Sequence, residues 1–462
     1  MGLVIVFSIA VFLFTFKYLQ VPPGIETDEG SVAYDAVLVA KTMRDQWGRF
    51  LPVFFLSGDQ SDWKPPVLIY LTAAFFKVFG ASVAVLKLVP VTVTLAAMVV
   101  IWLILKTQFE NKFALAGLLI LITSPIVVIA ARTGTNTSYP VLFSAIWLLA
   151  MLHFEKSRKS GWLIVGAAAL GISIYGYKGM LLLIPPWEVL SIVYIFWLNK
   201  FKLNKIFFVQ ALVFTVTLLP FFGVTPILEQ KYPGAIFDRR QVAIESYRHY
   251  AYYWLANLGT AFLFVTGDVG KIFSVEKYGA FLLGTLPFFV IGVKKAMEKI
   301  SFPFFVLAAY VTAPMLFGLA GSEGYGHRLT AMVPPFVVLT TLGLQSIRKS
   351  PLRWTLVAFL VFNAMDFLGY YYYRYPNTHE TRMAFPNNLE SVFKELAQSS
   401  KTGGFTPYVE SLLYAKHGEG NKFFEAAYFD KPLKLWTLGE KLPENSLLLT
   451  NTDRPQFILE SP

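Results

Sequence analysis

The chain has 462 residues, of which 55% are hydrophobic and only 15% are charged, and its mean hydropathy is +0.54. Because soluble domains carry about 25% charged residues, this composition excludes an ordinary soluble domain and indicates a protein that uses the bilayer as its solvent. The net charge of +11 does not indicate a nucleic-acid partner, since most Lys and Arg residues fall in short gaps between apolar runs. Cysteine is absent, which excludes disulfides, thiol nucleophiles and thiolate metal sites.

Apolar runs near the roughly 20 residues that cross a hydrocarbon core recur along the chain as far as residue 372. The first run, from Met1 to Phe16, lacks a basic flank and a small-residue cleavage site, so we expect an uncleaved span rather than a signal peptide. The pattern predicts an all-α polytopic membrane fold with about eleven spans. They are expected near residues 1–20, 84–105, 113–131, 138–154, 162–177, 180–198, 206–222, 279–293, 302–320, 329–346 and 354–372.

The apolar run 67–80 is too short for a span and contains Lys77, which is typical of an interfacial or re-entrant helix. If this run lies on the surface, all the later basic gaps fall on one side of the membrane. These gaps contain Lys106 and Lys112, Lys156 to Lys159, Lys200 to Lys205, Lys294 to Lys299, and Arg348 to Arg353. The positive-inside rule places them in the cytoplasm and the polar loop 21–66 outside, in a multi-pass protein of the plasma membrane.

The same threading places four more segments on the outer face: 132–139, 223–278, 322–328 and the C-terminal tail. In the tail, helical patterns at 388–398 and 409–416 and strand patterns at 446–450 and 457–459 predict a small α/β region. We therefore expect a transmembrane catalytic region over residues 1–372 and an extracytoplasmic region over residues 373–462.

An acidic pair, Asp28 and Glu29, follows the first span directly. One interpretation is a helix start, with Thr27 or Asp28 as the N-cap and Glu29 stabilised by the helix dipole. The other is catalytic: a carboxylate at the membrane surface removes the proton from an acceptor hydroxyl, with Asp28 as the base and Glu29 as the reserve candidate. Both interpretations can hold together.

Several basic residues are predicted at the outer level, where the positive-inside rule makes them unexpected. Lys64, in the run Asp62-Trp63-Lys64-Pro65-Pro66 that opens the short helix, is expected to face a phosphate rather than a protein carboxylate. The alternative is a lysine that snorkels to lipid headgroups. Together with Lys64, three further residues are candidates to hold a lipid-linked phosphate as it leaves: Arg132, Lys178 and Arg328.

His249 and His327 are candidate contacts to a substrate or a metal, as are Asp62 and Asn136. Two distant histidines do not form a zinc motif, so no cofactor is assigned and a divalent metal stays an open alternative. The aromatic residues around His249 are typical of an interfacial belt. The sequence has no Walker loop and no dinucleotide fingerprint.

Taken in order, these motifs resemble the GT-C membrane glycosyltransferases of the dolichyl-phosphate-mannose protein mannosyltransferase superfamily, in particular the bacterial branch with the lipid A aminoarabinose transferases. The resemblance covers about residues 1–372. It rests on Asp28-Glu29, Lys64-Pro65-Pro66 with Leu68 to Leu71 and Phe79-Gly80, Leu88 to Val93, Ala131 to Thr133, Lys178-Gly179, and His327-Arg328 ahead of Pro334-Pro335.

The resemblance implies a multi-spanning bundle, surface helices in a large first outer loop, and a sugar donor carried on a lipid phosphate. It also implies that Asp28 faces the acceptor and that Lys64 reaches the donor phosphate. The chain departs from the family at Trp63, where the aminoarabinose transferases have Glu, and at Asn136, where many relatives have Asp. Both departures argue against assigning an aminoarabinose or mannosyl substrate.

The favoured interpretation is a transferase that moves a sugar from a polyprenyl-phosphate donor to a protein, lipid or polysaccharide acceptor on the extracytoplasmic face. Its partners would be that donor, the unidentified acceptor and membrane lipid. A secondary transporter or lipid flippase is the alternative from another class, but transporters place coupling residues near the bilayer midplane, and here the ionisable residues gather at the outer level. An oligosaccharide transferase with a pyrophosphate donor is the third alternative.

Overall fold

The computed structural model describes residues 1–60, 62–236, 246–268, 270, 273–275, 277–320, 324–347, 351–451 and 457–460, so parts of the predicted outer segments 223–278 and 322–328 lie outside the described residues. Contacts divide the chain into two compact units. The helical unit comprises Met1–Phe16, Val91–Ala131 and Asn136–Tyr370. The mixed unit comprises Lys17–Pro90, Arg132–Thr135 and Tyr371–Pro462. Residues 17–90 therefore belong with the C-terminal region by contact, although the predicted boundary at 372 separates them along the chain.

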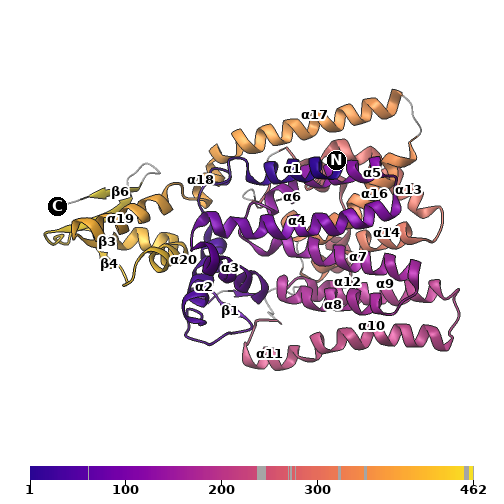
Figure 1. Cartoon of the computed structure of the whole chain (residues 1–462), viewed down its shortest axis with the longest axis horizontal. Helices are drawn as coiled ribbons and strands as arrows, with labels where there is room; N and C mark the ends of the chain where they lie inside the picture. Colours follow the sequence, from indigo (N-terminus) through magenta and orange to yellow (C-terminus); the bar gives the residue numbers. More distant parts are fainter. Residues whose placement is uncertain are drawn as a thin grey trace. The chain divides into compact units, whose positions relative to one another are not determined.

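The helical unit is a bundle of long apolar helices joined by short turns (Figure 1). Among the described residues, five helical stretches are long and apolar enough to cross a membrane by length and composition: Val83–Gln108, Asn136–Ser157, Met180–Leu198, Lys205–Lys231 and Pro351–Asn377. The elements that contribute to this unit are α1 (Gly2–Thr15), α4 (Val83–Gln108), α5 (Asn111–Thr123), α6 (Pro125–Ala130), α7 (Tyr139–Ser157), α8 (Gly161–Gly176), α9 (Met180–Leu198), α10 (Lys205–Gly223), α11 (Thr225–Lys231), α12 (Tyr247–Ala256), α13 (Leu286–Met297), α14 (Phe302–Thr312), α15 (Met315–Ala320), α16 (Val333–Ser346) and α17 (Pro351–Tyr373), with short turns η1 (Asn136–Ser138), η3 (Phe262–Thr266), η4 (Leu283–Thr285), η5 (Gly326–Arg328) and η6 (Thr330–Met332).

A helix forms in each region where the apolar pattern predicts a span, but several boundaries differ: α1 ends at Thr15, and the region 113–131 divides into α5 and α6 at Pro125. Helix α13 begins at Leu286 rather than near 279, because Pro287 occupies its first turn, where a missing N–H costs nothing. The region 302–320 divides into α14 and α15 around Pro314, since proline cannot donate the helical hydrogen bond.

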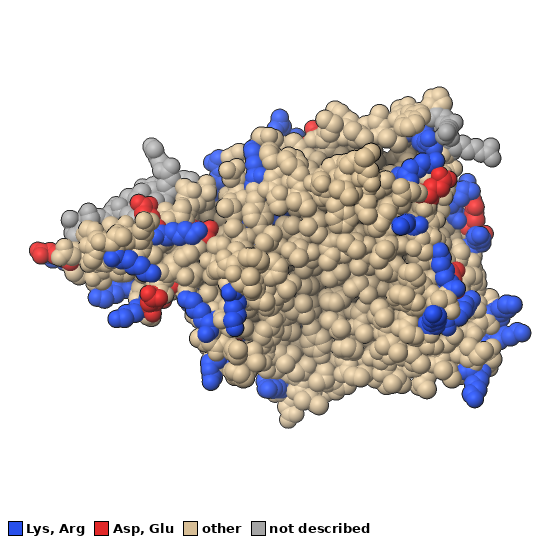
Figure 2. Space-filling view, viewed as in Figure 1, with Lys and Arg blue, Asp and Glu red and all other residues tan. Residues whose placement is uncertain are grey.

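The basic turns of the helical unit meet at one end of the bundle. Lys156 Nζ donates to the Thr107 carbonyl at 3.0 Å, and Arg158 Nη1 donates to the Leu198 carbonyl at 2.9 Å. The Glu110 N–H donates to the Gln345 side chain at 3.3 Å. These contacts join the reversals α4–α5, α7–α8, α9–α10 and α16–α17, and Figure 2 shows Lys and Arg gathered there beside a broad uncharged surface. This arrangement agrees with the prediction that the basic gaps share one side.

Glycine allows helices α13 and α16 to cross in backbone contact. A side chain on Gly292 would collide with the Leu339 carbonyl, and one on Gly343 would collide with the Phe288 carbonyl. Small residues at a crossing let two membrane helices approach closely, because apolar lipid supplies no hydrophobic drive for their association. Beside this crossing, the rings of Phe281 and Phe336 stack with 3.6 Å between their centroids.

The mixed unit combines surface helices with two small sheets. Strands β3, β4 and β5 are parallel, β6 is antiparallel to β5, and the sheet order is β4-β3-β5-β6. The predicted strands at 446–450 and 457–459 and the helix at 388–398 are present, whereas 409–410 lie in β3 rather than in a helix. The elements are α2 (Thr27–Thr42), β1 (Phe55–Leu56), β2 (Trp63–Lys64), α3 (Pro66–Phe79), η7 (Tyr375–Asn377), α18 (His379–Ala384), α19 (Leu389–Gly403), β3 (Thr406–Glu410), α20 (Ser411–Tyr428), β4 (Lys434–Trp436), β5 (Ser446–Asn451) and β6 (Phe457–Glu460).

Helix α2 packs against α3 and against α20 from the C-terminal region. A side chain on Gly30 in α2 would lie 2.7 Å from the backbone nitrogen of Gly420, so only glycine permits this approach. Glu419 then accepts hydrogen bonds from Gln46 Nε2 at 3.1 Å and from the Gly58 N–H, which are groups of the first loop. The acidic pair at the start of α2 is thus positioned by residues from both ends of the sequence.

Candidate functional site

The two carboxylates of the acidic pair have different environments. The N-cap of α2 is Glu26, not Thr27 or Asp28 as predicted, because Glu26 and Glu29 form a reciprocal capping box. Glu26 Oε1 accepts from the Glu29 N–H at 3.1 Å, and Glu29 Oε2 accepts from the Glu26 N–H at 3.0 Å. Glu29 is fully buried, whereas the side chain of Asp28 is 59% exposed.

Glu29 also holds the turn that follows α6. Its Oε1 accepts a hydrogen bond from the Gly134 N–H. Burial raises the pKa of the Glu29 carboxyl, although the Lys87 ammonium and the Gly134 and Glu26 N–H groups oppose this shift. Glu29 therefore has a structural role in the helix start and the 132–135 turn, and Asp28 is the member of the pair that faces solvent.

Lys64 lies directly beside Asp28. The hairpin of β1 and β2 pairs Phe55 with Lys64 and leaves the Lys64 side chain 10% exposed. Its Nζ lies 2.5 Å from Asp28 Oδ1 and 3.2 Å from Asp62 Oδ2. Burial opposes the charged form, but the two carboxylates outweigh it and raise the pKa of Lys64, so the side chain is an ammonium.

The expectation that Lys64 faces no protein carboxylate is therefore wrong. The sequence places Asp28 and Lys64 in different motifs, and only the packing of α2 on α3 joins them. The arrangement offers an exposed carboxylate and a cation at one point of the mixed unit, with Asp62 as a second carboxylate on the same cation.

Arg132 is buried, with an exposed fraction of 1%. Its Nε donates to the Val21 carbonyl at 2.9 Å, its Nη2 donates to the Lys17 carbonyl at 3.1 Å, and its guanidinium lies 5.2 Å from the Tyr372 ring centroid. In this structure Arg132 joins the segment after α1 to the last turn of α17, within the mixed unit. A contact between Arg132 and a donor phosphate stays a prediction.

The helical unit contains the other five candidate residues, and each lies at the start or end of a helix or in a short turn. Lys178 is half-buried in the turn between α8 and α9, and Asn136 begins η1. His249 is exposed in the first turn of α12, where its N–H donates to Ser246 Oγ at 3.3 Å. Arg328 is exposed with its guanidinium 5.2 Å from the Tyr325 ring centroid, next to His327 in η5.

His327 has a buried carboxylate partner that the sequence did not indicate. Asp268 Oδ2 lies 2.5 Å from His327 Nδ1 and accepts from the His327 N–H at 2.8 Å. The Asp268 side chain is 2% exposed and the His327 side chain 15%. A carboxylate on one ring nitrogen fixes the orientation of an imidazole, as in many proton-transfer and ligand-binding sites. The available signal was Asp268 between Gly267 and Gly270, a polar turn in an aromatic loop.

The mixed unit thus contains Asp28, Glu29, Asp62, Lys64 and Arg132, and it brings Asp28, Asp62 and Lys64 into direct contact. Within the described part of the chain, no three His, Asp or Glu side chains are placed to hold a metal ion.

Comparisons with known proteins agree with this architecture. The family model for dolichyl-phosphate-mannose-protein mannosyltransferase matches residues 63–223, which include Lys64, Arg132 and Lys178. No curated protein sequence matches the chain.

Solved structures match nearly the whole chain. ArnT from Cupriavidus metallidurans superposes in its apo state with a TM-score of 0.59 at 15% identity, over 94% of this chain and 85% of that protein. Its complex with undecaprenyl phosphate gives 0.54 at 17% identity, over 92% and 75%. The Archaeoglobus fulgidus oligosaccharyltransferase AglB, bound to an inhibitory peptide and a dolichol-phosphate, gives 0.52 at 11% identity over 92% of this chain, which spans 64% of AglB.

Proposed function

We propose that this chain, which shares the fold of ArnT, is a GT-C membrane glycosyltransferase that transfers a sugar from a polyprenyl-phosphate donor to an acceptor hydroxyl at the membrane surface. The contact between Asp28 and Lys64 carries the proposal, because it places a solvent-exposed carboxylate and a lysine ammonium at one point. In the proposed transfer, the carboxylate is the base for the acceptor hydroxyl and the ammonium stabilises the leaving phosphate. The lipid tail of the donor stays in the bilayer, so its sugar phosphate meets the enzyme at the interface.

The reaction is an in-line displacement at the anomeric carbon. The acceptor oxygen forms a bond to this carbon while the bond from the carbon to the phosphate oxygen breaks. Asp28 takes the proton of the acceptor hydroxyl, and the polyprenyl phosphate leaves with the electron pair as an anion. Lys64 stabilises the charge that develops on the leaving phosphate. In the free protein Lys64 is paired with Asp28, so donor binding exchanges one anionic partner of the lysine for another.

Arg132, Lys178 and Arg328 are proposed as further contacts to the donor phosphate. Asp62, Asn136, His249 and His327 are proposed as contacts to the substrates. The extracytoplasmic location of the site is part of the same proposal, and it is supported by the basic turns that meet at one end of the helical unit.

The distribution of buried charge supports a transferase over a transporter. Among the described residues, the charged side chains that are buried belong to the mixed unit, with Asp268 as the exception: Glu26, Glu29, Asp35, Asp45, Lys64, Lys87, Arg132 and Glu419. A transporter would concentrate such groups near the middle of the helical bundle. Glu188 within α9 of the helical unit is ionisable, but it is only half-buried. Its carboxylate accepts a hydrogen bond from Thr215 Oγ1 at 2.9 Å.

The test is to incubate the purified full-length protein with membranes and a panel of radiolabelled sugars on polyprenyl phosphate, and then to find where the label goes. We expect label to move from one of these donors to an acceptor with the wild-type protein, and not with Asp28→Asn. An oligosaccharide transferase with a pyrophosphate-linked donor is the competing interpretation, and the oligosaccharyltransferase AglB is among the structures that share this fold. Transfer from that donor alone would replace the present proposal with an oligosaccharide transferase, and transfer from neither class would contradict both.

A further inference from the structure

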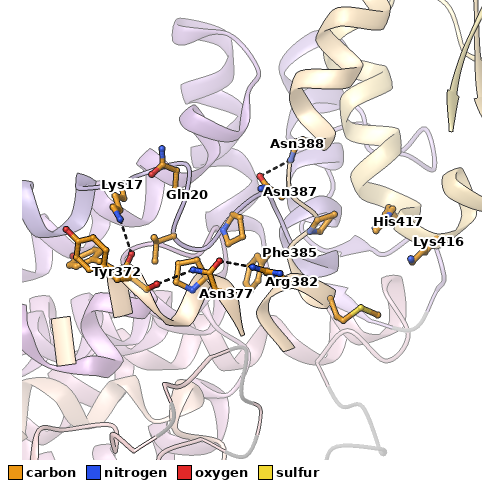
Figure 3. Close-up of a pocket in the computed structure, with 16 residues that line it drawn as sticks. Lys17, Gln20, Tyr372, Asn377, Arg382, Phe385, Asn387, Asn388, Lys416 and His417 are labelled. Atoms are coloured by element: carbon orange, nitrogen blue, oxygen red, sulfur yellow. Dashed lines mark hydrogen bonds between the residues drawn. The ribbon is translucent and has the colours of Figure 1, made fainter. Parts of the chain in front are cut away.

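The mixed unit contains a polar cavity that shares no residue with the Asp28 and Lys64 contact. It has a volume of about 570 Å³, within the range of cavities that hold small-molecule ligands. Three segments of the mixed unit line it: 17–23, 372–388 and 416–417 (Figure 3).

The lining is positively charged and rich in amides. Lys17, Arg382 and Lys416 line the cavity, and among its described lining residues none is Asp or Glu. Four amide side chains contribute both donors and acceptors: Gln20, Asn377, Asn387 and Asn388. A cavity with cations and without carboxylates favours an anionic ligand, and the amides suit a ligand that also has hydroxyl groups.

Two of the cations are held in place by neutral groups. Lys17 Nζ lies 3.7 Å from the Tyr373 ring centroid and 3.4 Å from the Tyr372 carbonyl oxygen. Arg382 Nη2 donates to Asn377 Oδ1 at 2.9 Å, as the dashed line in Figure 3 marks. Because these partners are neutral, they orient the two cations without cancelling their charge.

Aromatic and pyrrolidine surfaces complete the lining. Tyr373 is 59% exposed, and Pro376 and Pro386 are half-buried, so these three side chains present apolar surface to the cavity. A sugar ring has an apolar face that can pack on such surfaces and hydroxyl groups at its edge that the amides can bind.

We propose that this cavity binds an acidic saccharide, one that bears a carboxylate or a phosphate group. The cations bind the anionic group, the amides bind the sugar hydroxyls, and the aromatic and proline surfaces pack against the ring. The site is connected to the candidate phosphate-binding residues through Arg132, which donates to the Lys17 carbonyl and lies over the Tyr372 ring. The binding proposal does not depend on the proposed transfer reaction.

The first experiment measures binding to the purified full-length protein by isothermal titration calorimetry. The probes are glucuronic acid, glucose 6-phosphate, glucose and glycerol 3-phosphate. We expect the two acidic sugars to bind at least about 10-fold more tightly than glucose, because glucose lacks the charge-assisted contacts. Equal affinity for glucose would overturn the anionic part of the proposal. Glycerol 3-phosphate that binds as tightly as glucose 6-phosphate would show that the cavity recognises a phosphate headgroup instead of a saccharide.

The second experiment locates the binding site. Arg382→Ala and Lys416→Ala replace exposed side chains, and each should weaken glucuronic acid binding by about 10-fold. Lys401→Ala is the matched control, since Lys401 is 65% exposed on α19 of the same unit and does not line the cavity. Equal losses of glucuronic acid affinity in all three variants would show that only the overall surface charge matters, and this would contradict the proposal. Asp28→Asn should bind glucuronic acid like the wild type, which separates this site from the proposed reaction.

Discussion

Nζ of Lys64 lies 2.5 Å from Oδ1 of Asp28, so the cation assigned to the donor phosphate is already neutralised by the carboxylate assigned to the acceptor. The two groups are 36 positions apart in sequence and meet through the packing of α2 on α3. A phosphate that takes over Lys64 releases Asp28 for proton transfer. Donor binding and activation of the base are therefore coupled in the proposed mechanism.

Replacing Asp28 with Asn should lower turnover by roughly 100-fold or more, the usual scale for a positioned base, while donor binding persists. The helix start is not disturbed by this change, because Glu26 and Glu29 form the capping box. Turnover and donor affinity are measured on the monodisperse protein in detergent. Asp430→Asn is the matched control, since it removes an exposed carboxylate of the same unit that lies outside the proposed site. Full activity of Asp28→Asn would contradict the base assignment.

Lys64→Ala should weaken donor binding by about 1.5–3 kcal/mol, the scale of a charge-assisted hydrogen bond. Lys64→Arg keeps the charge and should lose less. Donor affinity is measured by competition with a labelled polyprenyl-phosphate sugar. Lys77→Ala, an exposed lysine on α3, serves as the control. Unchanged donor affinity in Lys64→Ala would contradict the phosphate contact and would show that Lys64 serves only its ion pairs with Asp28 and Asp62.

Glu29→Gln should lower thermal stability, in contrast to Asp28→Asn. The Glu29 carboxylate accepts from the N–H groups of Glu26 and Gly134 with its two oxygens, and an amide can replace only one of them. A buried N–H without its acceptor costs about 1–3 kcal/mol. The melting temperature of the purified protein measures the loss. If Glu29→Gln keeps its melting temperature but loses turnover, Glu29 and not Asp28 is the reacting carboxylate.

The pH dependence of stability should reflect two buried carboxyls of the mixed unit. Burial raises the pKa of Asp35 from 3.8 to about 7 and that of Glu26 from 4.5 to about 8. The folded state then binds protons more tightly than the unfolded state, so this stabilisation is complete below the ordinary pKa values and is lost as the pH rises through 7 and 8. We expect the melting temperature to fall between pH 5 and pH 8.5, and to fall less in Asp35→Asn.

Asp430→Asn is the control for this pH series, because the Asp430 side chain is 91% exposed. A flat profile in the wild type, or the same slope in Asp35→Asn, would contradict the assignment.

Single cysteines test the orientation in the membrane, since the chain has none of its own. In intact cells, Lys401→Cys should react with a membrane-impermeant maleimide and Lys112→Cys should not. The two positions are matched, with side chains that are 65% and 63% exposed. The expectation follows from the basic turns at one end of the helical unit. Labelling of Lys112→Cys from outside would show that the basic turns face outward and would contradict the proposed orientation.

The apolar segments could be predicted because each is local: a run of apolar residues with few charges forms a helix in lipid regardless of distant contacts. The strands at 446–450 and 457–459 were also visible in the residue pattern, but the order β4-β3-β5-β6 was not, because pairing joins segments that the sequence separates. The same holds at the site. Asp28 and Lys64 were identified as individual residues, and their contact was not.

The cap of α2 shows a different limit. Thr27 and Asp28 are common N-cap residues, whereas Glu26 gains this position because Glu29, three residues later, returns a hydrogen bond to its N–H. Asp268 was missed for a further reason. An aspartate between glycines in a loop has no periodic pattern, and its role depends on His327, which approaches it only in the folded chain.

The close approach of Gly30 to Gly420 has a consequence for synthesis in the cell. The ribosome delivers α2 and its acidic pair early, but α20, against which α2 packs, is made only after the last long helix, α17. At about 5–20 residues per second, most of the chain must be translated before the first loop can complete its packing. Asp28 and Lys64 both lie in segments made early, so their contact can form first, whereas the face of α2 at Gly30 stays without its C-terminal partner until α20 has been translated.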